Sequence, residues 1–172
     1  MTMAMSYKMN DKKIPKSKRN INLGELVFTK RPERFHLLGI GTCLGIYLYD
    51  LKKGNYMISH SVLPKHRAKD RKIAERDLGH FTDVAIKIMI KKMKKLGSRP
   101  ASIKCKLVGG AKIFNSTFEI GKDNIECAKS ILEEENIELV AEAIGGTHSR
   151  SITEFKRNGD LELKENGKDY TI

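Results

Sequence analysis

The chain has 172 residues, of which 40% are hydrophobic and 31% are charged, with a formal net charge of +12. This length suits one folded domain with a substantial core and is short for two. No run approaches the ~20 apolar residues of a membrane-spanning helix and the lysine-rich start lacks a secretory signal's apolar segment, so we expect a cytoplasmic protein without membrane insertion.

Residues 1–20 are polar, basic and without hydrophobic periodicity, so we expect a flexible extension ahead of a domain spanning residues 21–172. A second basic stretch covers residues 65–76. Neither carries an RNP-like aromatic strand or a zinc-finger spacing, so we interpret the charge as a solvated surface and expect no specific nucleic-acid partner. A basic nucleic-acid-binding domain is the alternative, and binding that survives physiological salt would favour it.

The first half of the domain is rich in predicted strands. We expect strands over residues 24–29 and 35–39, each a short β-prone run. Residues 44–49 and 56–64 are also β-prone, and the turn at residues 51–55 between them predicts a hairpin.

A glycine-rich segment, LGIGTCLGIYLYD, occupies residues 38–50 and places glycines on both sides of the Thr42–Cys43 pair. Glycine lets the backbone adopt unusual angles and approach other groups closely, so a lone cysteine in this setting is a candidate nucleophile. The glycine spacing is similar to that of a dinucleotide-binding loop. That loop must open a helix, whereas residues 44–49 are β-prone, so the sequence does not favour nucleotide binding.

His60 lies in the second strand of the predicted hairpin, within YMISHSVLP, where its side chain can come close to Cys43. A neighbouring imidazole can hold a thiolate as an ion pair and serve as its acid and base. The structural alternative is that both side chains pack in the core, because free cysteine is among the most buried residue types. His148, beside a second glycine turn, is the rival candidate for the base.

Two amphipathic helices are expected over residues 81–96 and 121–135, because apolar residues recur there at three- and four-residue steps. Between them, residues 101–108 alternate as a half-buried strand that ends at Gly109–Gly110. This glycine pair indicates a sharp turn or a close backbone approach.

Cys105 and Cys127 fall on apolar faces of a predicted strand and a predicted helix, so we interpret both as core residues. Three cysteines without CxxC spacing argue against a disulfide framework and against a structural zinc site. We expect neither a metal nor an organic cofactor.

The chain is predicted to end in strands over residues 137–144, 151–156 and 161–164, with a hairpin turn at Asn158–Gly159. The order of elements predicts one α/β domain. In it, two main helices cover mixed, mostly antiparallel β-sheets in a layered, sandwich-like arrangement.

Several strings together resemble the CheD family of chemoreceptor glutamine deamidases: LGIGTCLGIYLYD, SHSVLP, HFTDVAIKIMIKKMKKLG, KLVGGAKIF, IGKDN and IGGTHSRSITEF. The resemblance covers residues 23–164, and the Cys-to-His spacing and the GGA element are its specific parts. It implies that Cys43 is the nucleophile and His60 the general base. The family's third site residue, a threonine, falls here on Leu37, which cannot orient an imidazole by hydrogen bonding.

The resemblance further implies hydrolysis of glutamine side chains on the cytoplasmic helices of chemoreceptors, giving glutamate and ammonia through a thioester. Backbone amides around Gly41, Thr42 and Cys43 would stabilise the oxyanion, and those of Gly109–Gly110 would help to bind substrate. A CheC-type chemotaxis phosphatase is the implied partner. The alternative is a non-catalytic signalling module that binds the receptor or CheC, which the missing hydroxyl at Leu37 favours.

Overall fold

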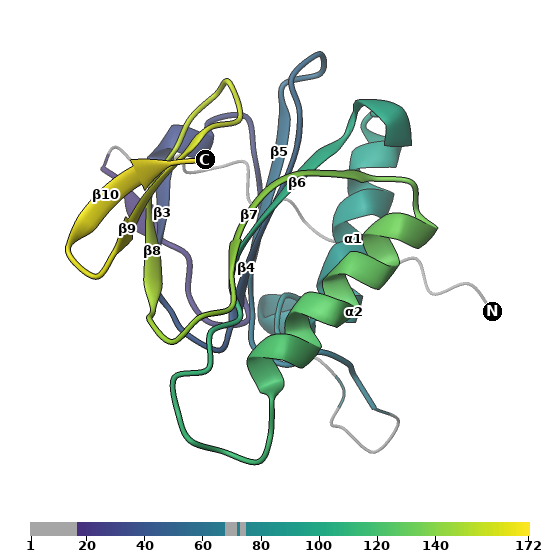
Figure 1. Cartoon of the computed structure of the whole chain (residues 1–172). Coiled ribbons are helices and arrows are strands. Elements are labelled where there is room, and N and C mark those ends of the chain that lie inside the picture. Colours follow the sequence, from purple (N-terminus) through teal and green to yellow (C-terminus); the bar gives the residue numbers. More distant parts are fainter. Residues whose placement is uncertain (1–16, 68–71, 73–74) are drawn as a thin grey trace.

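Two five-stranded β-sheets lie face to face, and two helices cover the outer face of one of them (Figure 1). The computed structural model describes residues 17–67, 72 and 75–172. We call the sheet between the other two layers the central sheet, and the sheet without helices the outer sheet. The predicted layered α/β domain with two main helices is confirmed.

The outer sheet has the order β1 (Arg19–Asn20), β3 (Phe35–Ile40), β8 (Arg150–Phe155), β9 (Leu161–Glu165), β10 (Lys168–Thr171). The central sheet has the order β2 (Leu26–Thr29), β5 (Asn55–Ser61), β4 (Leu44–Asp50), β6 (Lys104–Gly109), β7 (Glu138–Ile144). The β1–β3 and β6–β7 pairs are parallel and the others are antiparallel. The helices are α1 (Thr82–Lys95) and α2 (Ile120–Glu134), and short 3-10 turns cover Pro32–Arg34, Glu75–Asp77 and Pro100–Ser102.

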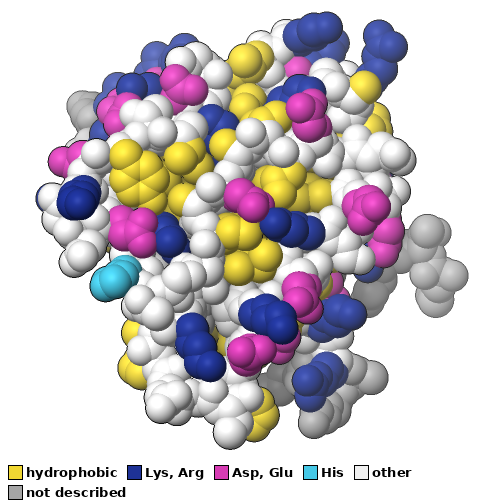
Figure 2. Space-filling view, in the orientation of Figure 1, with side chains coloured by type: hydrophobic (Ala, Val, Ile, Leu, Met, Phe, Trp, Pro, Cys, Tyr) yellow, Lys and Arg dark blue, Asp and Glu magenta, His cyan; other side chains and the backbone are white. Residues whose placement is uncertain are grey.

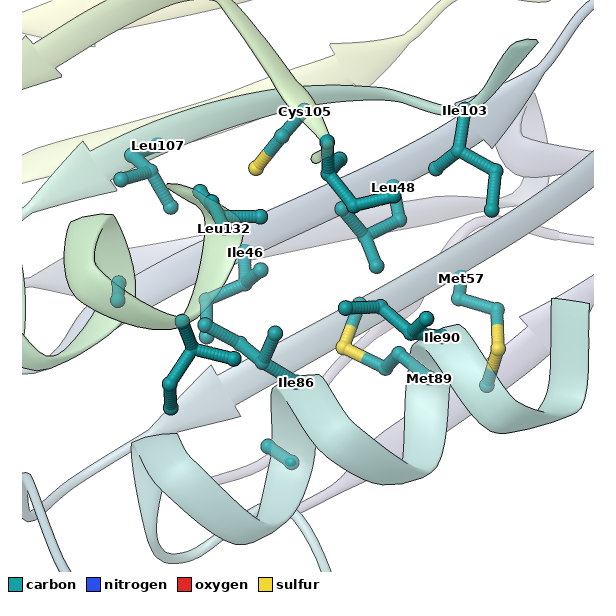
Figure 3. Close-up of a cluster of buried hydrophobic side chains, with 14 of the residues drawn as sticks. Ile46, Leu48, Met57, Ile86, Met89, Ile90, Ile103, Cys105, Leu107 and Leu132 are labelled. Carbon is teal, nitrogen blue, oxygen red and sulfur yellow. The ribbon is translucent and has the colours of Figure 1, made fainter. Parts of the chain in front are cut away.

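Strand β4 lies in the middle of the molecule and is buried along its whole length. Because successive side chains of a strand point to opposite faces, Ile46 and Leu48 face the helices while Tyr47 and Tyr49 face the outer sheet. Figure 3 shows Ile46 and Leu48 packed among side chains from β6, α1 and α2. This strand therefore contributes to both cores.

Helix α1 packs on the central sheet through residues at three- and four-residue steps: Ala85, Ile86, Met89, Ile90 and Met93. Val84 and Ile88 belong to the same apolar repeat but are only partly buried, because the buried stripe is rotated toward Ile86 and Ile90. Cys105 and Cys127 are buried in the same core, as predicted.

Two short strands were not predicted. Arg19–Asn20 forms β1 against Phe35 and His36, and Ile21 is fully buried, so the sheet begins ahead of the expected boundary at residue 21. Residues 1–16 of the expected extension lie outside the described residues. At the other end, Lys168–Thr171 forms β10 through pairing with β9, although its polar sequence gives no strand signal.

The face shown in Figure 2 carries basic and acidic side chains interspersed with apolar ones. Many lysines pair with carboxylates, as in Lys94–Glu135, Lys129–Glu142 and Lys156–Glu162. Within the described ranges, neither helix is both long and apolar enough to cross a bilayer.

Gly121, in the first turn of α2, provides a test of how the helix docks. Alanine normally favours a helix over glycine by up to about 1 kcal/mol. Here a Cβ at position 121 would lie 2.5 Å from the Gly110 carbonyl oxygen, so Gly121→Ala should instead lower the free energy of unfolding by about 1–3 kcal/mol. Urea denaturation measures this, with Ser130→Ala on the exposed face of α2 as the control. A stabilised Gly121→Ala variant would contradict the close packing.

Candidate active site

Cys43 lies where the chain crosses from the outer sheet to the central sheet, between Ile40 at the end of β3 and Leu44 at the start of β4. Its side chain is half-buried against the core between the sheets. Hydrogen bonds from Gly110 N–H to the Cys43 carbonyl (2.7 Å) and from Ala111 N–H to the Gly41 carbonyl (2.9 Å) hold this turn. The nucleophile candidate is therefore fixed through its backbone.

The Gly109–Gly110 turn makes this contact possible. Both residues have positive φ angles, +111° and +65°, which residues with a side chain rarely adopt. A Cβ at Gly109 would collide with the Cys43 carbonyl oxygen, and a Cβ at Gly110 would collide with Ile125 of α2. The predicted close backbone approach is confirmed. Because its N–H donates to the Cys43 carbonyl, Gly110 supports the turn that carries Cys43 rather than presenting that amide to a substrate.

His60 lies on β5 directly opposite Gly45 of β4 and is 3% exposed. Its backbone is fixed on the other side as well, because its N–H donates to the Glu25 carbonyl (3.1 Å) and its carbonyl accepts from Gly24 N–H (2.8 Å). The alternation along β5 places the imidazole on the same face as Ile58, toward the core between the sheets.

The pairing register brings Cys43 and His60 to one face of the central sheet. Cys43 stands two positions before Gly45, the cross-strand partner of His60, so the two side chains occupy diagonal positions. Cβ atoms in diagonal positions are typically within about 7–8 Å of each other. Gly45 has no side chain, and the position a Cβ would take there is bordered by the side chains of Ile40, Leu37 and Ile152.

The hydrogen bonding of the imidazole defines its tautomer. Nδ1 of His60 lies 3.3 Å from the Ile21 carbonyl oxygen, which can only accept, so Nδ1 carries the proton and Nε2 is left with a lone pair. Nε2 is buried and makes no hydrogen bond to any residue in the described part of the chain. Nε2 thus has a free lone pair on the face of the sheet that Cys43 shares, and no hydrogen bond joins it to Cys43 among the described residues.

Burial keeps both groups neutral in the free protein. It raises the pKa of the Cys43 thiol above its ordinary value. It also lowers the pKa of the His60 imidazole, although the hydrogen bond to Ile21 opposes this effect. The resting site therefore holds a thiol and a neutral imidazole rather than a preformed ion pair.

Leu37 is fully buried in the core between the sheets and would contact a Cβ placed at Gly45. Its side chain cannot orient His60, as expected from the sequence. The Ile21 carbonyl makes the orienting hydrogen bond instead, so the missing hydroxyl does not leave the imidazole unsupported. Sequence patterns contain no signal for this, because any residue has a carbonyl.

His148, the rival base, is exposed on the turn between β7 and β8. Its ring lies 3.4 Å from the Thr147 hydroxyl, and no hydrogen bond joins it to Cys43 among the described residues. The turn itself is near the site, since Gly145 N–H donates to the Gly109 carbonyl (2.9 Å).

A hollow of about 600 Å³ opens beside Thr42. Its walls come from the loop after Gly110 and from the start of α2, and include Ile113, Phe114 and Ile125. Phe114 is 73% exposed, so much of this surface is apolar and accessible. Thr42 lines the hollow, whereas its neighbour Cys43 does not. Thr42 thus faces a space that a substrate segment could occupy.

Asn124 is a site residue that the sequence analysis missed. Its side-chain amide donates to the Thr42 carbonyl (3.1 Å) and the Val62 carbonyl (3.0 Å), and its oxygen accepts from the Thr82 hydroxyl (2.9 Å). The available signal was its spacing: Asn124 lies four residues before Ala128 on the buried stripe of α2, where an aliphatic residue is expected.

Comparison with known proteins finds relatives over most of the chain. The family model described as CheD chemotactic sensory transduction matches residues 62–165. A probable chemoreceptor glutamine deamidase CheD of Methanococcus maripaludis strain C6 is 32% identical over 155 residues, covering 88% of this chain and 97% of that protein. This chain belongs to the CheD family. The resemblance inferred from the motifs is confirmed.

Two further CheD relatives carry the same name. The protein of Clostridium tetani is 36% identical over 152 residues, covering 86% of this chain and 90% of its own. That of Clostridium botulinum strain Hall is 34% identical over 152 residues, covering 86% and 92%. Among solved structures, a Bacillus licheniformis hypothetical protein, YfiH, aligns with a TM-score of 0.41 and 14% identity over 77% of this chain and 61% of that chain, a likeness too weak to establish a shared fold.

The neutral resting pair predicts how Cys43 reacts with iodoacetamide. Because burial raises the thiol pKa, the alkylation rate should keep rising with pH and reach half its maximum above about 8.5, the ordinary thiol value. Cys127, whose pKa burial raises to about 11, and the fully buried Cys105 should react more slowly. Peptide mass mapping follows all three thiols in one sample. A rate plateau between pH 6 and 8 would reveal a preformed thiolate–imidazolium pair instead.

Proposed function

We propose that this protein hydrolyses the side-chain amide of glutamine residues in chemoreceptors, releasing ammonia and leaving glutamate. Its CheD relatives are named probable chemoreceptor glutamine deamidases. The observation that supports the chemistry is the unpaired Nε2 of His60 on the sheet face shared with Cys43. The hollow beside Thr42 offers room for the segment that carries the glutamine.

In the first half of the reaction, Nε2 of His60 takes the proton from Cys43 Sγ as the sulfur attacks the carboxamide carbon. The carbonyl oxygen becomes an oxyanion, which backbone N–H groups at Thr42 and Cys43 stabilise. His60 then passes the proton to the amide nitrogen. The carbon–nitrogen bond breaks, ammonia leaves, and a thioester to Cys43 remains.

In the second half, Nε2 of His60 takes a proton from a water molecule that attacks the thioester carbon. The carbon–sulfur bond breaks, the thiol is regenerated with the proton from His60, and the product is glutamate. Throughout, the Ile21 carbonyl holds Nδ1–H, so it favours the imidazolium that forms transiently. The reaction uses water alone as the second substrate.

The product differs from the substrate by a negative charge on the receptor. The substrate we propose is the helical cytoplasmic part of a chemoreceptor, and the proposed place of action is the cytoplasm. A CheC-type phosphatase as a regulatory partner likewise rests on the family resemblance.

The first test is removal of the nucleophile. Cys43→Ala should abolish ammonia release from a purified chemoreceptor cytoplasmic fragment, because the other two thiols, Cys105 and Cys127, are buried in the core between the central sheet and the helices. Cys127→Ala removes a thiol from α2, away from the proposed chemistry, and should retain activity. Ammonia assays and the mass shift of glutamine-containing peptides report the result. Release that persists in Cys43→Ala would exclude the mechanism.

The second test is replacement of the base. His60→Gln keeps an amide N–H that can bond to the Ile21 carbonyl but cannot take up a proton at neutral pH. We expect kcat to fall by about 10²–10⁴-fold. The variant should remain folded, as judged by circular dichroism. Activity within a few-fold of the unmodified protein would point to another base, of which His148 is the first to examine.

A further inference from the structure

Three successive carbonyl groups at the Cys43 turn each accept a hydrogen bond from inside the domain. The Gly41 carbonyl accepts from Ala111 N–H (2.9 Å) and the Cys43 carbonyl accepts from Gly110 N–H (2.7 Å). The carbonyl between them, that of Thr42, accepts from the side chain of Asn124 (3.1 Å). Two of these three donors are backbone groups and one is a side chain.

These bonds also determine where the N–H groups point. A trans peptide is planar, and its C=O and N–H point in opposite directions. Since the Gly41 and Thr42 carbonyls point toward the interior, the N–H groups of Thr42 and Cys43 point away from those donors. Neither N–H donates to another residue within the described ranges. Two adjacent N–H groups that bind no other residue in the described part of the chain thus lie at the candidate nucleophile. That of Cys43 contacts its own sulfur, and Thr42 lines the hollow.

The orientation of Asn124 is itself fixed. Its side chain is fully buried, its amide nitrogen bonds to both Thr42 and Val62, and its oxygen accepts from the Thr82 hydroxyl (2.9 Å). This one side chain therefore joins α2 and α1 to the Cys43 turn and to the end of β5. A flipped amide would place its oxygen against two carbonyl oxygens, so the observed orientation is strongly preferred.

We propose that Asn124 is a positioning residue that turns the Thr42–Cys43 peptide so that the Cys43 N–H faces the oxyanion of the reaction. This proposal rests on the deamidase function proposed above. Asn124 acts through the peptide and does not touch the substrate. Its donation to the Thr42 carbonyl also polarises the peptide and strengthens the Cys43 N–H as a donor. The loss of one such oxyanion donor typically lowers kcat by about 10²–10³-fold.

The test separates oxyanion stabilisation from thiol reactivity. In Asn124→Ala, kcat for deamidation of a chemoreceptor cytoplasmic fragment should fall by about 10²-fold with KM nearly unchanged. Alkylation of Cys43 by iodoacetamide displaces iodide from a saturated carbon and forms no oxyanion. The alkylation rate should therefore stay within about threefold of that of the unmodified protein at each pH. This change is far smaller than the fall in kcat that follows the loss of an oxyanion donor.

Further variants separate the proposed role from a loss of stability. Asn55→Ala removes another buried asparagine, which bonds to Ser98 at the far end of the β4–β5 hairpin, and should lose comparable stability but keep kcat. Thr82→Val removes the hydroxyl that orients Asn124 and should lower kcat, whereas Thr82→Ser keeps the hydroxyl and should restore it. Thermal unfolding of each variant gives the change in stability.

The proposal is overturned if Asn124→Ala keeps kcat within threefold, or if kcat and the Cys43 alkylation rate fall together. Amide hydrogen exchange provides a test that needs no activity: Thr42 and Cys43 N–H should exchange rapidly, while Gly110 and Ala111 N–H are protected. Protection at Thr42 and Cys43 would also overturn it. Failure of the deamidase function gives a different result. In that case the unmodified protein releases no ammonia, or the Cys43→Ala variant releases it as well, and neither outcome depends on the amide exchange.

Discussion

The contact between two backbone turns, residues 41–43 and 109–111, is the constraint on which the site depends. It fixes the point where the chain passes from the outer sheet to the central sheet, and so fixes Cys43 relative to His60 on the neighbouring strand. Helix α2 packs against the same contact, because Gly121 and Gly110 approach more closely than any side chain would permit. Cys43, the start of β4 and the start of α2 are therefore positioned together.

Burial has opposite consequences for the resting and the reacting states. In the free protein it raises the pKa of the Cys43 thiol and lowers that of His60, so each group alone resists ionisation. Proton transfer from sulfur to imidazole creates two opposite charges at once. Their attraction is stronger in a poorly solvated site than in water, which partly offsets the cost of burying them. In the proposed reaction, substrate and the unpaired N–H groups supply the remaining stabilisation.

Periodicity and turn chemistry were sufficient to predict most of the fold. The apolar repeat predicted α1 and α2, alternation predicted β6, and Asn158–Gly159 predicted the β8–β9 hairpin. These features are local, so a sequence records them directly. By contrast, β1 and β10 form only because a partner strand supplies their hydrogen bonds, and their own residues carry little signal.

The same distinction applies to the site. Cys43 and His60 could be singled out as candidates because their side chains are chemically unusual for their positions, whereas the group that hydrogen-bonds His60 could not. The Ile21 carbonyl performs a task for which a side-chain hydroxyl was expected at Leu37, so the residue type at position 37 does not by itself decide between an enzyme and a binding module. Ile21 is held in turn by its N–H bond to the His36 carbonyl (3.0 Å) on β3. The orientation of His60 thus depends on residues 19–21, which pair with β3 of the outer sheet although His60 lies on the central one.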